Sequence, residues 1–119
     1  MGWLLDKNRP ICPQICEQVC VKIANGELKP NERLLSVREV ALQAGVNPNT
    51  VQKSFEQLEH QGLIHSVRGS GWFVGEDIAA SVEIVEGLVR EKTETYFKDM
   101  QNLGFDTEKT KNYLKGWNK

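Results

Sequence analysis

The sequence lacks any long hydrophobic run, and this absence excludes a membrane-spanning helix. Of its 119 residues, 39% are hydrophobic and 26% are charged, which is ordinary for a soluble globular protein. No apolar stretch approaches the roughly 18 residues that a membrane span needs. The first residues also lack the basic start and the long apolar stretch of a signal peptide. We therefore expect a cytoplasmic protein with no membrane contact.

A strong excess of positive charge is missing as well. The formal net charge is −1, with eight Lys and Arg against seven Asp and Glu in residues 1–75 and seven against nine in residues 76–119. Phosphate contacts need local positive charge, so bulk charge does not indicate a nucleic-acid partner. A DNA-binding function has to be inferred from where particular residues stand.

Side chains that carry catalysis or bind metals are scarce. The two histidines, His60 and His65, stand far along the chain from the three cysteines. No nucleophile paired with a base, phosphate-binding loop or pair of carboxylates stands out. The sequence therefore predicts no enzyme, no cofactor and no metal site.

The three cysteines, Cys12, Cys16 and Cys20, recur at every fourth residue, which places them along one side of a helix. Thiols one helical turn apart are badly placed for a disulfide. We interpret them as small apolar residues at the edge of a buried stripe, where free cysteine is common. A redox or metal switch made of these thiols is the alternative hypothesis.

Two helices are predicted in the first third of the chain. The first begins after Pro10 and closes at Gly26, a residue suited to the left-handed position after a helix. An irregular connection covers residues 27–35. Ser36 and Glu39 then have the spacing of a capping box, which predicts the start of the second helix.

A glycine-centred turn leads from the second helix into a third. Asn47 and Pro48 suit the N-cap and the first position of the third helix, which runs to about His60. Two short helices joined in this way are typical of a helix-turn-helix. The inner face of the third helix carries Val51, Phe55 and Leu58, and its outer face carries Asn49, Gln52 and Lys53.

A hairpin follows the third helix. Residues 63–67 and 72–74 have strand composition, and the residues between them are turn formers, with Arg68 and Gly69 at the tip. Three helices followed by a hairpin predict a winged helix-turn-helix that ends near Gly75. The expected fold class is α+β and mainly α.

Residues 76–119 are predicted to form a short tail of two helices. Asp77 suits the N-cap of the first, and Gly104 suits its end. A single apolar stripe on each helix cannot form an independent core, so we expect this tail to pair two copies of the chain. The expected dimerisation residues form a heptad-like seam: Val82, Val85, Val89, Tyr96, Met100 and Leu103.

Five stretches of the first part resemble a known family. They are GELKP (26–30), LLSVRE (34–39), GVNPNTV (45–51), LEHQGLI (58–64) and VRGSGWFV (67–74). Together they make residues 10–75 similar to the DNA-binding domain of the GntR family of bacterial regulators. The short tail is similar to the YtrA-type subfamily, and this resemblance implies a homodimeric repressor with a two-helix dimerisation tail.

The resemblance also implies which residues meet DNA. It places Arg38 at a phosphate or a base edge, and Arg68 and Gly69 in or beside the minor groove. Asn49 and Gln52 can pair with adenine, and Lys53 can donate to guanine or phosphate. Many relatives have Arg where this chain has Pro48 and Gln52. The expected DNA-binding residues are Ser36, Arg38, Asn47, Asn49, Thr50, Gln52, Lys53, Arg68 and Gly69.

The leading hypothesis is therefore a homodimer that binds double-stranded operator DNA. Two recognition helices about 34 Å apart would read a near-palindrome. The alternative is a winged-helix protein-interaction module that does not contact DNA, which the weak charge balance and Pro48 favour. Relief by a small-molecule inducer lodged between the wing domain and the tail stays an open alternative, because domain junctions commonly form pockets. The tail is too short for the effector domains of larger relatives, so the resemblance implies no ligand residues.

Overall fold

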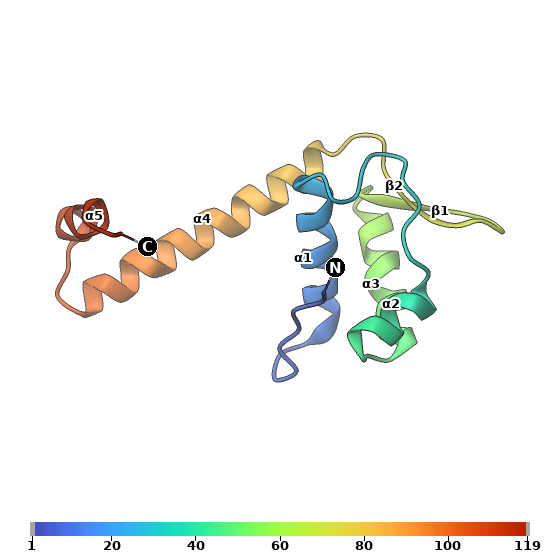
Figure 1. The fold of residues 1–119 in the computed structure, drawn as a ribbon, viewed down its shortest axis with the longest axis horizontal. Coiled ribbons are helices and arrows are strands. Elements are labelled where there is room, and N and C mark those ends of the chain that lie inside the picture. The colour runs from blue at the N-terminus through green and yellow to red at the C-terminus, as the bar shows by residue number, and fades with distance from the viewer. Residues whose placement is uncertain (1, 119) are drawn as a thin grey trace. The chain divides into compact units, whose positions relative to one another are not determined.

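A computed structural model describes residues 2–118, and their contacts divide the chain into a first unit up to Val85 and a second unit from Glu86 (Figure 1). None of the helices in residues 2–118 is long and apolar enough to cross a membrane. The elements in chain order are α1 (Ile11–Ala24), α2 (Val37–Ala44), α3 (Pro48–His60), β1 (Ile64–Val67), β2 (Gly71–Val74), α4 (Ala79–Asn102) and α5 (Thr107–Lys115).

The core of the first unit lies between α1, α2, α3 and the base of the hairpin. Phe55 of α3 is 1% exposed and meets the Trp72 ring of β2 edge to face at 5.5 Å between ring centres. The predicted inner face of α3 is therefore confirmed. Fourteen apolar residues are buried in this core: Ile15, Cys16, Val19, Cys20, Ile23, Leu34, Val40, Ala41, Val51, Phe55, Leu58, Leu63, Ile64 and Val74.

Local capping fixes where α2 and α3 begin, as the sequence predicts. The Glu39 N–H donates to the Ser36 hydroxyl oxygen at 3.1 Å, and the Ser36 N–H donates to the Glu39 carboxylate at 3.0 Å. The Asn47 side-chain oxygen accepts from the N–H of Asn49 at 2.8 Å. Gly45 ends α2 at a φ of 67°, a left-handed conformation that glycine adopts without strain.

The hairpin forms as predicted, although its strands begin one residue away from the predicted starts. The connection in residues 27–35 contains no helix or strand, as predicted, but Arg33 forms an isolated antiparallel bridge with Phe73 that the sequence did not predict. The Leu34 N–H donates to the Trp72 carbonyl, and the Val74 N–H donates to the Glu32 carbonyl, both at 2.8 Å. The connection thus adds a third extended segment to the wing.

The second unit contains the rest of α4 and all of α5. α4 ends before Gly104, as predicted. The Asp106 carboxylate caps α5 by accepting from the Lys109 N–H at 2.8 Å. Thr110 is the one residue of segment 86–118 that is fully buried. Its hydroxyl donates to the Phe105 carbonyl at 3.3 Å and so ties α5 to the turn before it. This unit therefore has almost no core of its own.

Candidate DNA-binding surface

The outer face of α3 is free of cover from the rest of its unit. Asn49 and Lys53 are exposed, while Gln52 is half-buried and donates to the Glu56 carboxylate at 3.1 Å. The buried residues Val51, Phe55 and Leu58 hold the helix from behind. An exposed helix with amide and ammonium groups near its N-terminus has the form that enters a major groove.

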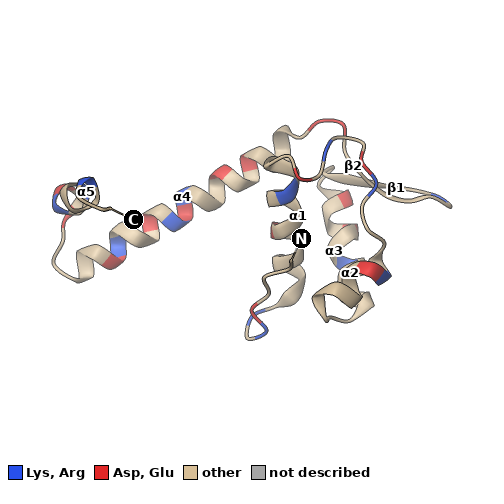
Figure 2. Cartoon of the chain, viewed as in Figure 1, with Lys and Arg blue, Asp and Glu red and all other residues tan. Residues whose placement is uncertain are grey.

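Three arginines lie in the elements around α3. Arg38 is in the first turn of α2, Arg68 is at the wing tip, and Arg33 is in the extended segment beside β2. All three are exposed, and none forms an ion pair within residues 2–118. Figure 2 shows Lys and Arg at the wing tip and near the start of α2. Free guanidinium groups in these places can donate to phosphate oxygens without first breaking a salt bridge.

Several of the sequence-predicted residues have structural tasks as well. The Ser36 and Asn47 side chains are occupied as helix caps. Thr50 is half-buried, and its carbonyl accepts from the Ser54 hydroxyl at 2.9 Å. Gly69 has a φ of 80° in the turn of the wing, which a residue with a side chain adopts only under strain.

Glu59 and Ser66 link α3 to the wing, a connection that sequence reasoning missed. One oxygen of the Glu59 carboxylate accepts from both the backbone N–H and the hydroxyl of Ser66, each at 3.0 Å. The pair joins the last turn of α3 to β1, so it controls where the wing lies beside the helix.

A segment before α1 also reaches the helix-turn-helix, and sequence analysis gave it no role. The Lys7 ammonium donates to the Gly45 carbonyl at 3.0 Å, in the turn between α2 and α3. Two glutamines hold the segment against α1. The Gln14 side chain pairs with the backbone of Asp6, and the Gln18 side chain pairs with the backbone of Leu4.

The three cysteines lie in α1, and two of them are buried. Burial raises the pKa of Cys16 to about 12 and that of Cys20 to about 11. The Cys16 thiol donates to the Ser54 carbonyl at 3.4 Å, and Cys12 is half-buried. Metal binding and redox chemistry require the thiolate, so these environments favour the apolar interpretation. Within residues 2–118 no cluster of three or more His, Cys, Asp or Glu side chains is placed to hold a metal ion.

The predicted dimerisation residues are distributed over both units. Val85 packs partly against the core of the first unit, and Val82 is half-buried there. In the second unit Val89 is 59% exposed and Leu103 is 74% exposed. An apolar hollow of about 580 Å³ on the second unit is lined by Tyr96, Met100, Leu103, Phe105, Tyr113, Leu114 and Trp117.

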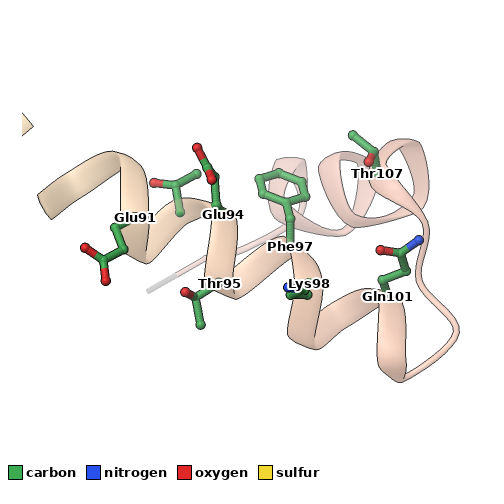
Figure 3. A pocket seen from close by; sticks show the side chains of 8 residues that line it. Glu91, Glu94, Thr95, Phe97, Lys98, Gln101 and Thr107 are labelled. Atoms are coloured by element: carbon green, nitrogen blue, oxygen red, sulfur yellow. The ribbon is translucent and has the colours of Figure 1, made fainter. Parts of the chain in front are cut away.

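Another side of the second unit mixes polar and charged side chains with the Phe97 ring and is the more polar of the two. Figure 3 shows side chains standing out from α4 around a shallow hollow, with carboxylates at Glu91 and Glu94 and an ammonium at Lys98. The mixture of charges gives no pattern typical of a metal or phosphate site. The tail helix therefore has one polar side and one apolar side, and the predicted residues Tyr96, Met100 and Leu103 line the apolar one.

Comparison with known proteins gives the family. Residues 13–74 match the family described as bacterial regulatory proteins, gntR family. The HTH-type transcriptional repressor YtrA of Bacillus subtilis is 35% identical over 109 residues, which are 89% of this chain and 82% of YtrA. The likeness to YtrA thus includes both the winged helix and most of the tail.

Solved structures agree with the fold. A GntR family transcriptional regulator from Listeria monocytogenes has a TM-score of 0.80 and 33% identity, covering 96% of this chain and all of that chain. The DNA-binding domain of AraR, solved in complex with operator ORE1, has a TM-score of 0.55 and 30% identity over 63% of this chain and 94% of that domain. The chain is therefore a member of the GntR family of DNA-binding transcriptional regulators, which are not enzymes, and it has the short tail of the YtrA-like members.

Proposed function

We propose that this regulator is a homodimeric repressor that binds a near-palindromic operator in the cytoplasm. The observation that carries the proposal is the exposed outer face of α3, flanked by arginines that have no ion-pair partner within residues 2–118. YtrA is a repressor by name, and the AraR domain was solved on an operator. Repression would follow from the occupied operator blocking the promoter.

In this proposal each part of the surface has a task. The N-terminal half of α3 enters the major groove, where Asn49 and Lys53 meet base edges or phosphates. Gln52 can contact a base only after its hydrogen bond to the Glu56 carboxylate is broken, which reduces the gain from the contact with the base. Arg38 at the start of α2 donates to the phosphate backbone. Arg68 reaches the minor groove from the wing.

A second copy of the chain is the partner proposed for the apolar side of the tail. Leu103 and the aromatic side chains around it leave a large apolar surface exposed in a unit that has almost no core. A contiguous exposed apolar patch on a small protein marks an interaction site. Pairing two copies also brings two recognition helices to the two halves of a palindrome.

Operator binding is tested by Arg38→Ala and Arg68→Ala, with Lys111→Ala on exposed α5 as the matched control. Operator fragments selected from a random duplex pool are titrated by fluorescence anisotropy across salt concentrations. Arg38→Ala should lower the salt slope by about 2, because the homodimer loses one phosphate contact at each half-site. Arg68→Ala should weaken operator binding, because both wings lose their minor-groove contact. The control should bind as the parent does, and thermal unfolding should be unchanged in all three.

Three outcomes would contradict parts of the proposal. Unchanged affinity and salt slope in both arginine variants would show that the surface is assigned wrongly. Failure of the parent to bind any duplex at low salt would favour the protein-interaction module instead. If the parent sediments as a monomer at the concentrations used for DNA binding, the proposed homodimeric state is wrong.

A further inference from the structure

Lys22, in the last turn of α1, is a buried cation without a carboxylate partner. Its side chain is 6% exposed, and it forms no ion pair within residues 2–118. Burial lowers its pKa, which the nearby Glu27 opposes. The Glu27 carboxylate is turned to Asn25, whose amide donates to it at 3.0 Å. No buried side-chain nitrogen within residues 2–118 lacks a hydrogen-bond partner, so the Lys22 ammonium, which donates no hydrogen bond there, keeps some contact with water. An anion that reached this ammonium would gain from its charge.

The indole of Trp3 occupies the place where such a partner would lie. The Lys22 ammonium lies 3.6 Å from the centre of the Trp3 ring, a cation–π contact. The Trp3 N–H donates to the Gln43 side chain at 3.4 Å, the one hydrogen bond recorded for this indole. The next residue, Leu4, is held by Gln18 on both its N–H and its carbonyl, at 3.0 and 2.6 Å. The chain is thus anchored at Leu4, while the indole before it is held by weak contacts.

A small apolar cavity lies beside the indole and the ammonium. Its volume is about 50 Å³, which leaves room for about one water-sized group while the indole is in place. A second hollow of about 270 Å³ also reaches Lys22, and its lining includes Leu4, Val21 and the Glu27 side chain. The cavity is lined by Trp3, Val19, Lys22, Leu28, Leu34, Leu35, Val40 and Phe55.

We propose that this cavity, closed by Trp3 over the unpaired Lys22, is a binding site for a small aliphatic carboxylate. The carboxylate would pair with the Lys22 ammonium, and the alkyl chain would replace the indole and continue into the apolar cavity. A few convergent polar groups in an otherwise apolar pocket are typical of small-molecule sites. The short aliphatic chain suits the narrow cavity, and the negative charge suits the lone ammonium.

The cavity also touches the DNA-binding elements. Val40 belongs to α2 and Phe55 to α3, so a ligand between them would alter how the two helices pack. Operator affinity should therefore fall when the carboxylate binds. This effect on operator affinity, but not the binding of the carboxylate, rests on the proposed function. The binding of the carboxylate itself can be measured without DNA.

The experiment titrates the full chain with hexanoate and follows the indole N–H signals by ¹⁵N NMR, using Trp3→Phe to identify the Trp3 signal. The Trp3 signal should shift and saturate, while the signal of Trp117 in the second unit serves as an internal control. Lys22→Met keeps the apolar stem but removes the charge, and it should weaken hexanoate binding by about tenfold or more. Lys111→Met should bind hexanoate as the parent does. Hexanol and hexylamine should bind far more weakly than hexanoate to the parent.

A second variant allows the test to decide even if Lys22→Met fails to fold. Trp3→Ala removes the indole that the ligand has to displace, so hexanoate should bind it more tightly than the parent, measured by calorimetry. Absence of a saturable Trp3 shift up to about 10 mM hexanoate would overturn the proposal. Equal affinity for hexanol and hexanoate would overturn it too. Hexanoate binding without any change in operator affinity would contradict only the inferred effect of the ligand on DNA binding.

Discussion

The two units of this chain use apolar side chains in opposite ways. In the first unit fourteen apolar residues are buried in one cluster, whereas in segment 86–118 Thr110 alone is buried and Tyr113, Leu114 and Trp117 are 47%, 39% and 58% exposed. A short segment with a single apolar stripe per helix gains too little burial to offset its conformational entropy. The comparison shows that the first unit has a buried core and that segment 86–118 has almost none. This difference is the reason for proposing that a second copy covers the tail.

The largest expected effect comes from emptying the core of the first unit. Phe55→Ala should lower the free energy of unfolding by about 3–5 kcal/mol, because it leaves a cavity where the ring met Trp72.

Leu103→Ala in the tail should act only through dimerisation. Its effect on the melting temperature should therefore depend on protein concentration, and that of Phe55→Ala should not. Chemical and thermal unfolding at several concentrations distinguish the two. A concentration-independent loss in Leu103→Ala would show that the tail is stable alone.

A charge on the apolar side of the tail should separate the two copies. Leu103→Glu should yield monomers in sedimentation and weaken operator binding by about 100-fold or more, because the second half-site loses its linked partner. Lys98→Glu on the polar side is the matched control and should leave the oligomeric state unchanged. Unchanged affinity in the monomeric variant would show that one copy is sufficient for DNA binding.

The link between α3 and the wing should affect DNA binding more than stability. Glu59→Ala frees Ser66 and should weaken operator binding by about fivefold, while Glu59→Gln keeps an accepting oxygen and should restore most of the affinity. In the variant that also has Arg68→Ala, the loss from Glu59→Ala should largely disappear, since the wing tip no longer contributes. Fully additive losses in this double-mutant cycle would contradict a positioning role.

The smallest effect concerns the cap of α2. Ser36→Ala should cost about 1 kcal/mol of stability. Hydrogen bonds from Ser36, the backbone N–H first, hold the pKa of Glu39 below its usual range. The ionised Glu39 side chain therefore contributes its full stabilisation above the ordinary carboxyl pKa of about 4.3. This stabilisation is lost as the pH falls through the lower pKa that Glu39 has in the folded protein. Glu39→Gln should remove this acid dependence, measured by urea unfolding against pH. The same pH dependence in both proteins would contradict it.

Much of the fold could be predicted because its signals are local. Ser36 with Glu39, and Asn47 with Pro48, define helix starts within four residues, and the winged helix-turn-helix follows from their order. The bridge between Arg33 and Phe73 was missed because it joins segments 40 residues apart and depends on the finished wing. The exposed residues of α3 were found from periodicity. The contacts of Glu59 with Ser66 and of Lys7 with Gly45 depend on side-chain positions that no periodic pattern encodes.

The unequal burial of the three cysteines has a practical consequence. Cys16 and Cys20 are buried and their pKa values are raised, whereas Cys12 is half-buried, with its sulfur 3.9 Å from the Gln57 side chain of α3. A maleimide or a trifluoromethyl reagent should therefore modify Cys12 first in the unaltered sequence. The attached fluorophore or fluorine nucleus would lie at the seam between the first helix and the recognition helix. It would report in real time on the repacking of that seam as DNA or a small molecule is added.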